Sequence, residues 1–501
     1  MSSLIKHSSL AKKIFALSAL TVFLSCFTFC FSQTRTVIEG AVLDSLYNSV
    51  LPYVHVLILK NNRGTITNEK GSYSIDLSDL APTDTVSFQF LGYKTKTITI
   101  NNLIKLPRVF LSENVMSIDE VIITNRNLDA EHIVKNVLKN KSANYQTNFH
   151  KDRIFVRERY ITDVNKIELD YKKSTIKELN EDIIRDFENK TPKNSTSYFD
   201  FLADFYIDAK RSELKLDPIK AVELTSKDLA GLENYKPLFD KLFANTGEEE
   251  YWKIKSGIFG QKIDLPKDSI RKQKSSENRP LKYYKYLIED KINYITFEDK
   301  DLWEFLHKTN RYNFEFEGST STNGESVYII SFTPKNKGMF EGKLYVSTDT
   351  YALLKASYKY SEGKTGKKFN FLGVGYEEID FHGTIYFEKV ADIYRLKYFS
   401  FNKKYNLRIK RKIALQKKKN RFLFDKKLVE LKIGLNLDLQ VQEAIEYFAI
   451  KTKKLTEEQF ENYKEKKTFN IINIDQFDKN LWKGYDIIEP TKQLKNYKKL
   501  E

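Results

Sequence analysis

The 501-residue chain has few of the residues that build covalent frameworks or metal sites. It contains two cysteines, Cys26 and Cys30, and six histidines. Both cysteines lie in a predicted N-terminal leader, so the mature chain would hold neither a disulfide framework nor a thiolate metal site. Glycine and proline are also scarce, with 19 and 10 residues, which excludes a collagen-like chain.

Sequence motifs of common enzymes are missing as well. The chain has no His-Glu-x-x-His zinc motif and no Gly-x-Ser-x-Gly nucleophile elbow. Gly363-Lys364-Thr365 matches the end of a phosphate loop, but Tyr358 stands where that loop requires a glycine. We therefore predict no catalytic residue, no cofactor and no metal, and we expect a protein that is not an enzyme.

The first 32 residues have the order of a secretory signal peptide. Lys6, Lys12 and Lys13 precede an apolar run over 14–31, and polar residues come after it. We predict cleavage after Ser32, and hence an exported protein that is periplasmic or associated with the outer membrane. Two alternatives stay open: the run could remain as an uncleaved anchor, or Cys26 could be a lipidation site.

The chain is basic, with 83 Lys and Arg against 67 Asp and Glu, a formal net charge of +16. Such an excess attracts anionic lipid headgroups or nucleic acid. Because export separates the protein from nucleic acid, we expect peripheral membrane association and no nucleic-acid partner.

The densest basic stretch, within 403–427, alternates apolar Leu407 and Ile409 with cationic residues, as in a strand that has one buried and one basic face. Three consecutive lysines then suggest a hairpin turn. One interpretation is a solvated edge that discourages pairing with other chains, and the other is contact with an anionic surface. The candidate residues for that contact are Arg408, Lys410, Lys412, Lys417, Lys418 and Lys419.

Residues 36–124 alternate apolar and polar side chains in several short runs, which predicts an all-β sandwich. Four stretches carry a recognisable pattern: Ile38-Glu39-Gly40-Ala41-Val42, Leu51-Pro52-Tyr53-Val54, Thr67-Asn68-Glu69-Lys70-Gly71 and Leu91-Gly92-Tyr93. In this order they resemble the carboxypeptidase-regulatory-like domain of Bacteroidota envelope proteins. The resemblance implies a seven-stranded prealbumin-like sandwich without an active site, and the remainder of the chain is similar to uncharacterised proteins that share this domain.

The rest of the chain divides into three parts by pattern. Residues 128–310 have apolar stripes at helical spacing, with Asn127 or Asp129 as a helix N-cap, and predict a mostly helical region. Residues 311–450 alternate again and predict an antiparallel sheet, loosely similar to the half-barrel of periplasmic lipoprotein carriers. Residues 451–501 predict a helix capped by Thr456 and Gln459 and a docking tail. The expected fold class is therefore multi-domain α+β.

These patterns favour a non-catalytic envelope protein that binds a lipid, a glycan or a protein partner. A scaffold in which the sandwich only spaces other domains explains the same features. A third hypothesis is a hydrolase of envelope polymers that uses an acid pair not recognisable in the sequence.

Overall fold

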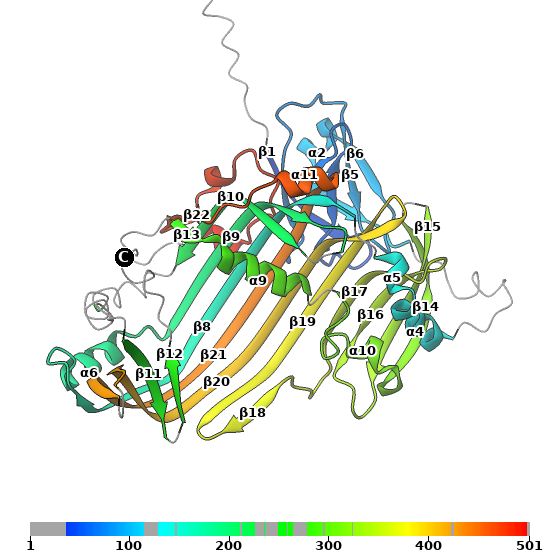
Figure 1. Ribbon diagram of the computed structural model, residues 1–501. Helices are drawn as coiled ribbons and strands as arrows, with labels where there is room; N and C mark the ends of the chain where they lie inside the picture. The colour runs from blue at the N-terminus through cyan, green and yellow to red at the C-terminus, as the bar shows by residue number, and fades with distance from the viewer. Residues whose placement is uncertain are drawn as a thin grey trace, which may run out of the picture.

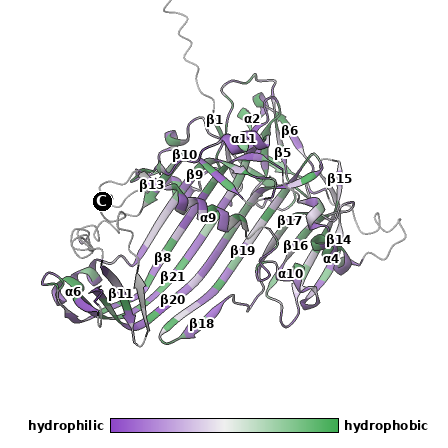
Figure 2. Cartoon of the chain, viewed as in Figure 1, coloured by the Kyte–Doolittle hydropathy of each residue, from purple (hydrophilic) through white to green (hydrophobic). Residues whose placement is uncertain are grey.

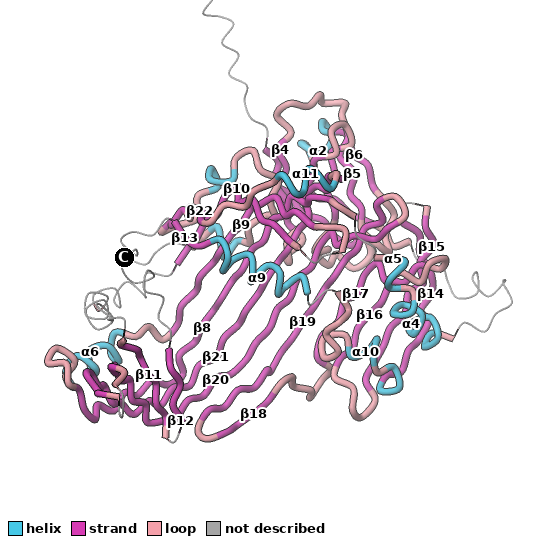
Figure 3. The backbone as a smooth tube through the Cα atoms, in the orientation of Figure 1, coloured by secondary structure: helices cyan, strands magenta, loops and turns pink. Residues whose placement is uncertain are grey.

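The computed structural model describes residues 37–114, 129–145, 148–210, 213–225, 235, 249–257, 259–263, 278–293, 296–322, 324–421 and 425–497. The predicted signal peptide and the segment 115–128, which includes the candidate N-cap Asn127, lie outside these ranges. The described chain is mostly β-strand (Figures 1 and 3). It forms a small β-sandwich and one sheet of 14 strands, rather than the α+β arrangement expected from the sequence.

The N-terminal sandwich confirms the fold predicted for it. Its two sheets have the strand orders β4-β1-β7 and β3-β2-β5-β6, and their inward side chains, among them Val42, Val56 and Phe88, are fully buried. Its elements are β1 (Val37–Asp44), β2 (His55–Ile58), β3 (Arg63–Ile66), β4 (Ser72–Asp76), β5 (Thr85–Gln89), β6 (Lys96–Thr99), α2 (Ile100–Lys105) and β7 (Arg108–Leu111).

The large sheet joins the middle of the chain to its C-terminal part. The hydrogen-bonded order is β14-β15-β16-β17-β19-β20-β21-β8-β9-β10-β23, with β11, β12 and β18 attached at the side. Strand β8 runs antiparallel to β21 along its whole length, from His150 opposite Lys454 to Ser174 opposite Leu431. The middle strands are β8 (His150–Ser174), β9 (Asn194–Ile207), β10 (Leu214–Thr225), β11 (Glu250–Ser256), β12 (Phe259–Ile263) and β13 (Asn278–Pro280).

The prediction of a mostly helical middle region is therefore wrong. Residues 200–207 of β9 are all buried, so this strand shows none of the alternation by which a half-buried strand is recognised. The helical stripes at either side of β8 were correct locally. Helix α4 (Ala130–Lys139) begins at Asp129, whose side chain accepts hydrogen bonds from the N–H groups of Glu131 and His132, and α6 (Glu181–Lys190) is capped by Asn180.

The C-terminal alternation does form antiparallel strands, but they do not make a separate sheet. Residues 393–419 form one continuous strand of 27 residues, β20. Lys417, Lys418 and Lys419 end this strand instead of forming its turn. The strands are β14 (Tyr312–Thr322), β15 (Glu325–Pro334), β16 (Phe340–Ser347), β17 (Leu353–Tyr360), β18 (Lys368–Phe371), β19 (Val374–Val390), β20 (Ile393–Lys419), β21 (Lys426–Lys454), β22 (Thr468–Asn470) and β23 (Ile472–Ile474).

Short helices and the tail complete the fold. The predicted capping box of Thr456 and Gln459 is present at the start of helix α11, which spans Glu457–Asn462. Trp482 is buried where the tail docks. The remaining helices are α5 (Lys141–Asn144), α9 (Leu281–Asn293), α10 (Glu304–His307), η2 (Thr309–Arg311), α11 (Glu457–Asn462), η3 (Lys479–Trp482) and α12 (Lys492–Lys495).

The two faces of the large sheet are covered by different layers at one end. On the inner face, which carries Val156 and Phe401, the sheet packs against α4, α9 and residues 296–307. On the outer face, Phe155 and Tyr398 pack against the sandwich and the C-terminal tail. Because successive side chains of a strand point to opposite faces, neighbours such as Phe155 and Val156 belong to different cores.

Polar pairs and one aromatic contact hold the sandwich and the C-terminal tail on the outer face of the large sheet. The buried guanidinium of Arg157 binds Asp200 through two hydrogen bonds of 2.8 and 2.7 Å and donates a third to the carbonyl of Ile488. The ring of Tyr53 stacks on Tyr398 with centroids 4.5 Å apart. Three other pairs join the sandwich to the rest: Arg63 with Asp486, Asn68 with the carbonyl of Glu489, and Glu69 with Arg159.

Lys355 lies buried in the contact between the sandwich and the sheet, and it should make stability depend on pH. Its Nζ is 3.8 Å from the centre of the Phe90 ring, and burial, aided by the charge of Lys343, lowers its pKa from 10.5 to about 7. In the unfolded chain the lysine keeps its proton up to its ordinary pKa. Between pH 7 and 10.5 this side chain thus binds more protons in the unfolded state, so the contribution of Lys355 to the free energy of unfolding should rise with pH.

We expect Lys355→Met to raise the free energy of unfolding at pH 7 by on the order of 3 kcal/mol and to flatten this rise. Urea unfolding at pH 7, 8 and 9 measures both effects. Lys359→Met, at an exposed lysine of the same strand, is the control. His55, whose pKa burial lowers to about 4, titrates below this window. An equal pH slope in the Lys355→Met variant and the wild type would contradict the assignment.

Candidate functional site

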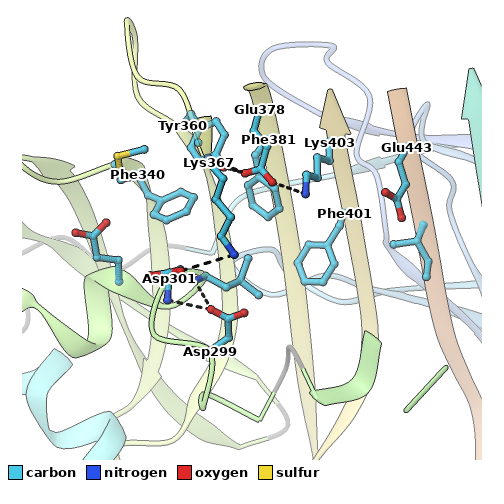
Figure 4. A pocket seen from close by; sticks show the side chains of 15 residues that line it. Asp299, Asp301, Phe340, Tyr360, Lys367, Glu378, Phe381, Phe401, Lys403 and Glu443 are labelled. Carbon is cyan, nitrogen blue, oxygen red and sulfur yellow. Dashed lines mark hydrogen bonds and ion pairs between the residues drawn. The ribbon is translucent and has the colours of Figure 1, made fainter. Parts of the chain in front are cut away.

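A cavity of about 430 Å³ opens on the inner face of the large sheet. Four strands supply its apolar floor: Phe340 from β16, Phe381 from β19, Phe401 from β20 and Ile445 from β21, while Tyr360 of the intervening β17 also lines the cavity (Figure 4). The ring centres of Phe340 and Phe381 are 5.9 Å apart, and those of Phe381 and Phe401 are 5.7 Å apart. Aromatic rings at such distances present a continuous apolar surface.

The segment 299–304 forms the opposite wall of the cavity. One oxygen of Asp299 accepts the N–H groups of Asp301 and Leu302, each at 2.9 Å. The wall is anchored below by Trp303, which is fully buried, and by Arg311, which binds Glu304 at 2.6 Å. These contacts fix the wall to the core that α4 and the sheet share.

Charged groups stand around the apolar floor. Glu378 accepts hydrogen bonds from the hydroxyls of Tyr360 and Tyr376, at 3.0 and 2.9 Å, and from the backbone N–H of Lys367. The ammonium of Lys403 lies 2.5 Å from the same carboxylate. Burial alone would raise the pKa of Glu378, but Lys403 and the other donors outweigh it, so this pKa lies below its ordinary value. Glu378 is therefore held as a carboxylate.

The floor of the cavity continues as an apolar surface along the strands. Strands β20 and β21 stay in unbroken register from Tyr398 opposite Phe448 to Lys417 opposite Val429. Every second residue after Phe401 and before Ile445 thus faces the same side as the cavity. We call the half-buried apolar part of this surface the apolar strip: Val164, Ile167 and Leu169 of β8, Tyr405, Leu407 and Ile409 of β20, and Leu435, Leu437, Leu439 and Val441 of β21.

The apolar strip lies between two packed clusters. At one end is the cavity with the inner core, and at the other Trp252 and Leu179 pack on Leu431. Apart from Val441, at the cavity end, none of the strip residues is itself buried in the described chain. From Phe401 to Leu415 the strand extends about 45 Å at its usual rise per residue. Figure 2 shows the long strands in this stretch with alternating apolar and polar residues and no described helix across them.

The opposite face of these strands carries part of the predicted basic site. Arg408, Lys410 and Lys412 are exposed there, and Arg408 binds Asp438 at 3.1 Å. Lys417 is instead only 9% exposed and lies 2.9 Å from Glu250. Lys418 is half-buried, and Lys419 lies 3.5 Å from Glu249. The six candidates do not share one open surface, and their contact with an anionic surface stays a prediction.

The sequence did not point to the cavity. Its lining comes from segments as distant as Asp299 and Ile445, and no local motif links them. Glu378 and Lys403 are separated by 25 positions of two neighbouring strands. A signal for the apolar strip did exist, since Leu407 and Ile409 alternate with cations. The sequence suggested that this apolar face is buried, whereas the structure leaves it half-exposed.

The described residues contain no group of three or more His, Cys, Asp or Glu side chains arranged to hold a metal ion. Among the described helices, none combines the length and apolar character needed to span a membrane.

Comparison with known proteins identifies one part of the chain. The sequence profile of the CarboxypepD_reg-like domain family matches residues 38–123, so the N-terminal sandwich is a domain of this kind. No curated protein matches the chain.

Among solved structures, the chain is similar to a putative outer membrane lipoprotein-sorting protein domain from Vibrio parahaemolyticus, with 10% identity, coverage of 66% of this chain and 97% of the other, and a TM-score of 0.19. It is also similar to the MucA/MucB complex of Pseudomonas aeruginosa, with 7% identity, coverage of 66% and 99%, and a TM-score of 0.16. These TM-scores are low, and we infer neither fold nor function from them.

We expect Lys403→Met to lower the free energy of unfolding at neutral pH by about 2 kcal/mol, because it removes a charged hydrogen-bond partner of Glu378. Removing the ammonium should also raise the pKa of Glu378 toward the value that burial favours. The stabilisation is complete above the ordinary pKa of a glutamate and is lost as pH falls through the depressed pKa in the folded state. Urea unfolding at pH 7 and at pH 3 measures the difference.

Lys404→Met provides the control, because Lys404 neighbours Lys403 in β20 but points to the other face. It should change stability little at either pH. A Lys403→Met variant as stable as the Lys404→Met variant at pH 7 would show that the ion pair with Glu378 does not stabilise the fold.

Proposed function

We propose that this protein binds an amphipathic ligand with an extended hydrocarbon chain, of the kind found in envelope lipids, along the inner face of the large sheet. It acts as a binding protein rather than an enzyme. The observation that carries the proposal is the apolar strip, which no described helix or strand covers and which continues into the cavity floored by Phe340, Phe381 and Phe401.

An apolar sheet face of this length is unfavourable in water, because each methylene group kept in contact with water costs about 0.8 kcal/mol relative to burial. A linear hydrocarbon chain matches the strip in shape and chemistry. The strip is made almost entirely of leucine, isoleucine and valine. These side chains offer neither hydrogen bonds nor stacking rings to a sugar, so the strip favours a lipid over a glycan.

The charges around the cavity suit the polar end of such a ligand. Lys367 stands at the rim, 3.7 Å from Asp301, and both side chains are largely exposed. Lys403 lies deeper in the cavity and forms an ion pair with Glu378. A phosphate or carboxylate headgroup could therefore pair with Lys367 in exchange for the weak surface ion pair with Asp301.

Glu378, the carboxylate paired with Lys403 in this cavity, does not suit the general-acid role that the hydrolase hypothesis requires. A general acid needs a carboxyl group whose pKa is raised toward the working pH, whereas Lys403 and the hydrogen bonds hold the pKa of Glu378 below its ordinary value.

We also propose that the protein is exported, and this part of the proposal rests on the sequence of residues 1–32.

We expect a fluorescent palmitate analogue to bind the purified protein, and Leu437→Lys to weaken that binding at least tenfold, because the substitution places a charge in the middle of the apolar strip. Fluorescence titration measures the affinity. Native mass spectrometry of protein purified gently from its own envelope should also detect an added mass of lipid size, which Leu437→Lys removes.

The matched control is Asn436→Lys, one residue away on the polar face, where Asn436 donates a hydrogen bond to Glu168 at 2.6 Å. This variant should bind the analogue as the wild type does. Equal affinities for Leu437→Lys and Asn436→Lys would refute the strip as the binding site. A wild-type protein that binds no palmitate analogue and carries no lipid would refute the proposed function.

A further inference from the structure

The turn between β18 and β19 exposes three large apolar side chains. Phe369, Phe371 and Leu372 are 51%, 66% and 50% exposed. Phe371 pairs with Val374, so Leu372 and Gly373 alone form the turn. Scattered exposed apolar residues are ordinary on a protein surface, whereas a contiguous group marks a surface that meets another apolar phase.

The backbone of this turn makes the leucine more unusual. Leu372 and Gly373 have φ angles of 49° and 78°. Two-residue hairpin turns with both φ angles positive prefer Asn-Gly or Asp-Gly, and a leucine is strained there. Gly373 itself cannot be replaced, because an added Cβ would lie 2.3 Å from the carbonyl oxygen of Lys410. Leu372 is thus unfavourable for the isolated fold both in conformation and in exposure.

Cationic residues of the neighbouring strand lie beside the same turn. The N–H of Lys410 donates to the carbonyl of Gly373 at 2.7 Å, which places this part of β20 against the tip. Lys410 and Lys412 are exposed, and Lys410 lies close enough to Glu168 to interact with its charge. The end of the sheet therefore combines an exposed apolar tip with exposed cations that can meet negative charge.

We propose that the β18–β19 tip docks on an anionic lipid bilayer. Phe371 and Leu372 enter the region between headgroups and acyl chains, and Lys410 and Lys412 meet the negative headgroups. Both interactions are those by which peripheral proteins bind membranes: burial of apolar side chains and attraction of basic residues to acidic lipid. An exposed, strained leucine such as Leu372 gains a favourable environment when the apolar part of a lipid bilayer surrounds it.

This docking also gives the apolar strip access to lipid. The ring of Phe369 stacks on Tyr376 at 5.7 Å, and Tyr376 pairs with Leu407 of the strip across β19 and β20. In Figure 1 the tip marked β18 lies away from the sandwich, beside the uncovered stretch of the long strands. The apolar surface is therefore continuous from the tip to the strip. The tip can dock whether or not the strip binds a ligand, so the two proposals can fail separately.

Vesicle co-sedimentation of the full protein tests the docking. We expect the wild type to bind vesicles of phosphatidylcholine with phosphatidylglycerol more tightly than vesicles of phosphatidylcholine alone, and high salt to weaken the difference. The double variant Phe371→Ser, Leu372→Asn should reduce binding to the mixed vesicles by on the order of tenfold. Lys410→Gln with Lys412→Gln should bring binding to the mixed vesicles close to that on phosphatidylcholine alone.

Leu372→Asn by itself separates docking from folding. Asparagine tolerates the positive φ of this turn better than leucine, so the variant should unfold at the same or a higher temperature and still bind vesicles less. Leu106→Asn, at a leucine of the sandwich that is 74% exposed, is the matched control and should bind like the wild type. The proposal is overturned if the wild type binds neither vesicle, or if Leu372→Asn and Leu106→Asn bind equally well.

Discussion

Three strands of the large sheet are longer than the layers that cover them. Strands β8, β20 and β21 have 25, 27 and 29 residues. The sandwich, α4 and α9 cover them at one end, and a smaller cluster around Trp252 and Leu179 covers the other. At the first end both faces are buried, and consecutive residues such as Tyr398, Phe399 and Ser400 are all buried. Between the two covered parts the same strands keep their pairing, but their side chains are half-exposed. The covered parts stabilise the sheet, and the uncovered stretch between them carries the candidate function.

This division explains where the sequence was informative. The sandwich was predictable because strands such as β1, β2, β4 and β7 alternate between more and less buried residues, so alternation and turn residues agree. Helices α4 and α11 were predictable because Asp129 and Thr456 cap them locally. Each of these signals lies within about a dozen residues, and none needs a distant partner.

The middle region was not predictable by the same means. Residues 200–207 of β9 are buried on both faces, which removes the period of two, and β8 pairs with β21, whose residues lie 257 to 304 positions away. The polar run Asn402-Lys403-Lys404 interrupts the alternation of apolar and polar residues. In the structure it continues β20 past the rim of the cavity, where Lys403 finds Glu378. A polar residue inside a strand here marks the boundary between the covered and the uncovered part of the sheet.

The candidate site shows a related limit. Alternation along 403–412 correctly predicted two chemically different faces, but it cannot tell whether an apolar face is packed or open, because both give the same pattern. Only the lengths of the covering elements decide this. The sandwich binds the outer face through Tyr53 and Glu69, and it binds the tail on that face through Arg63, so it cannot close over the inner face, where the apolar strip lies. Its position supports the covered end of the sheet and leaves the strip accessible from the side that the cavity faces.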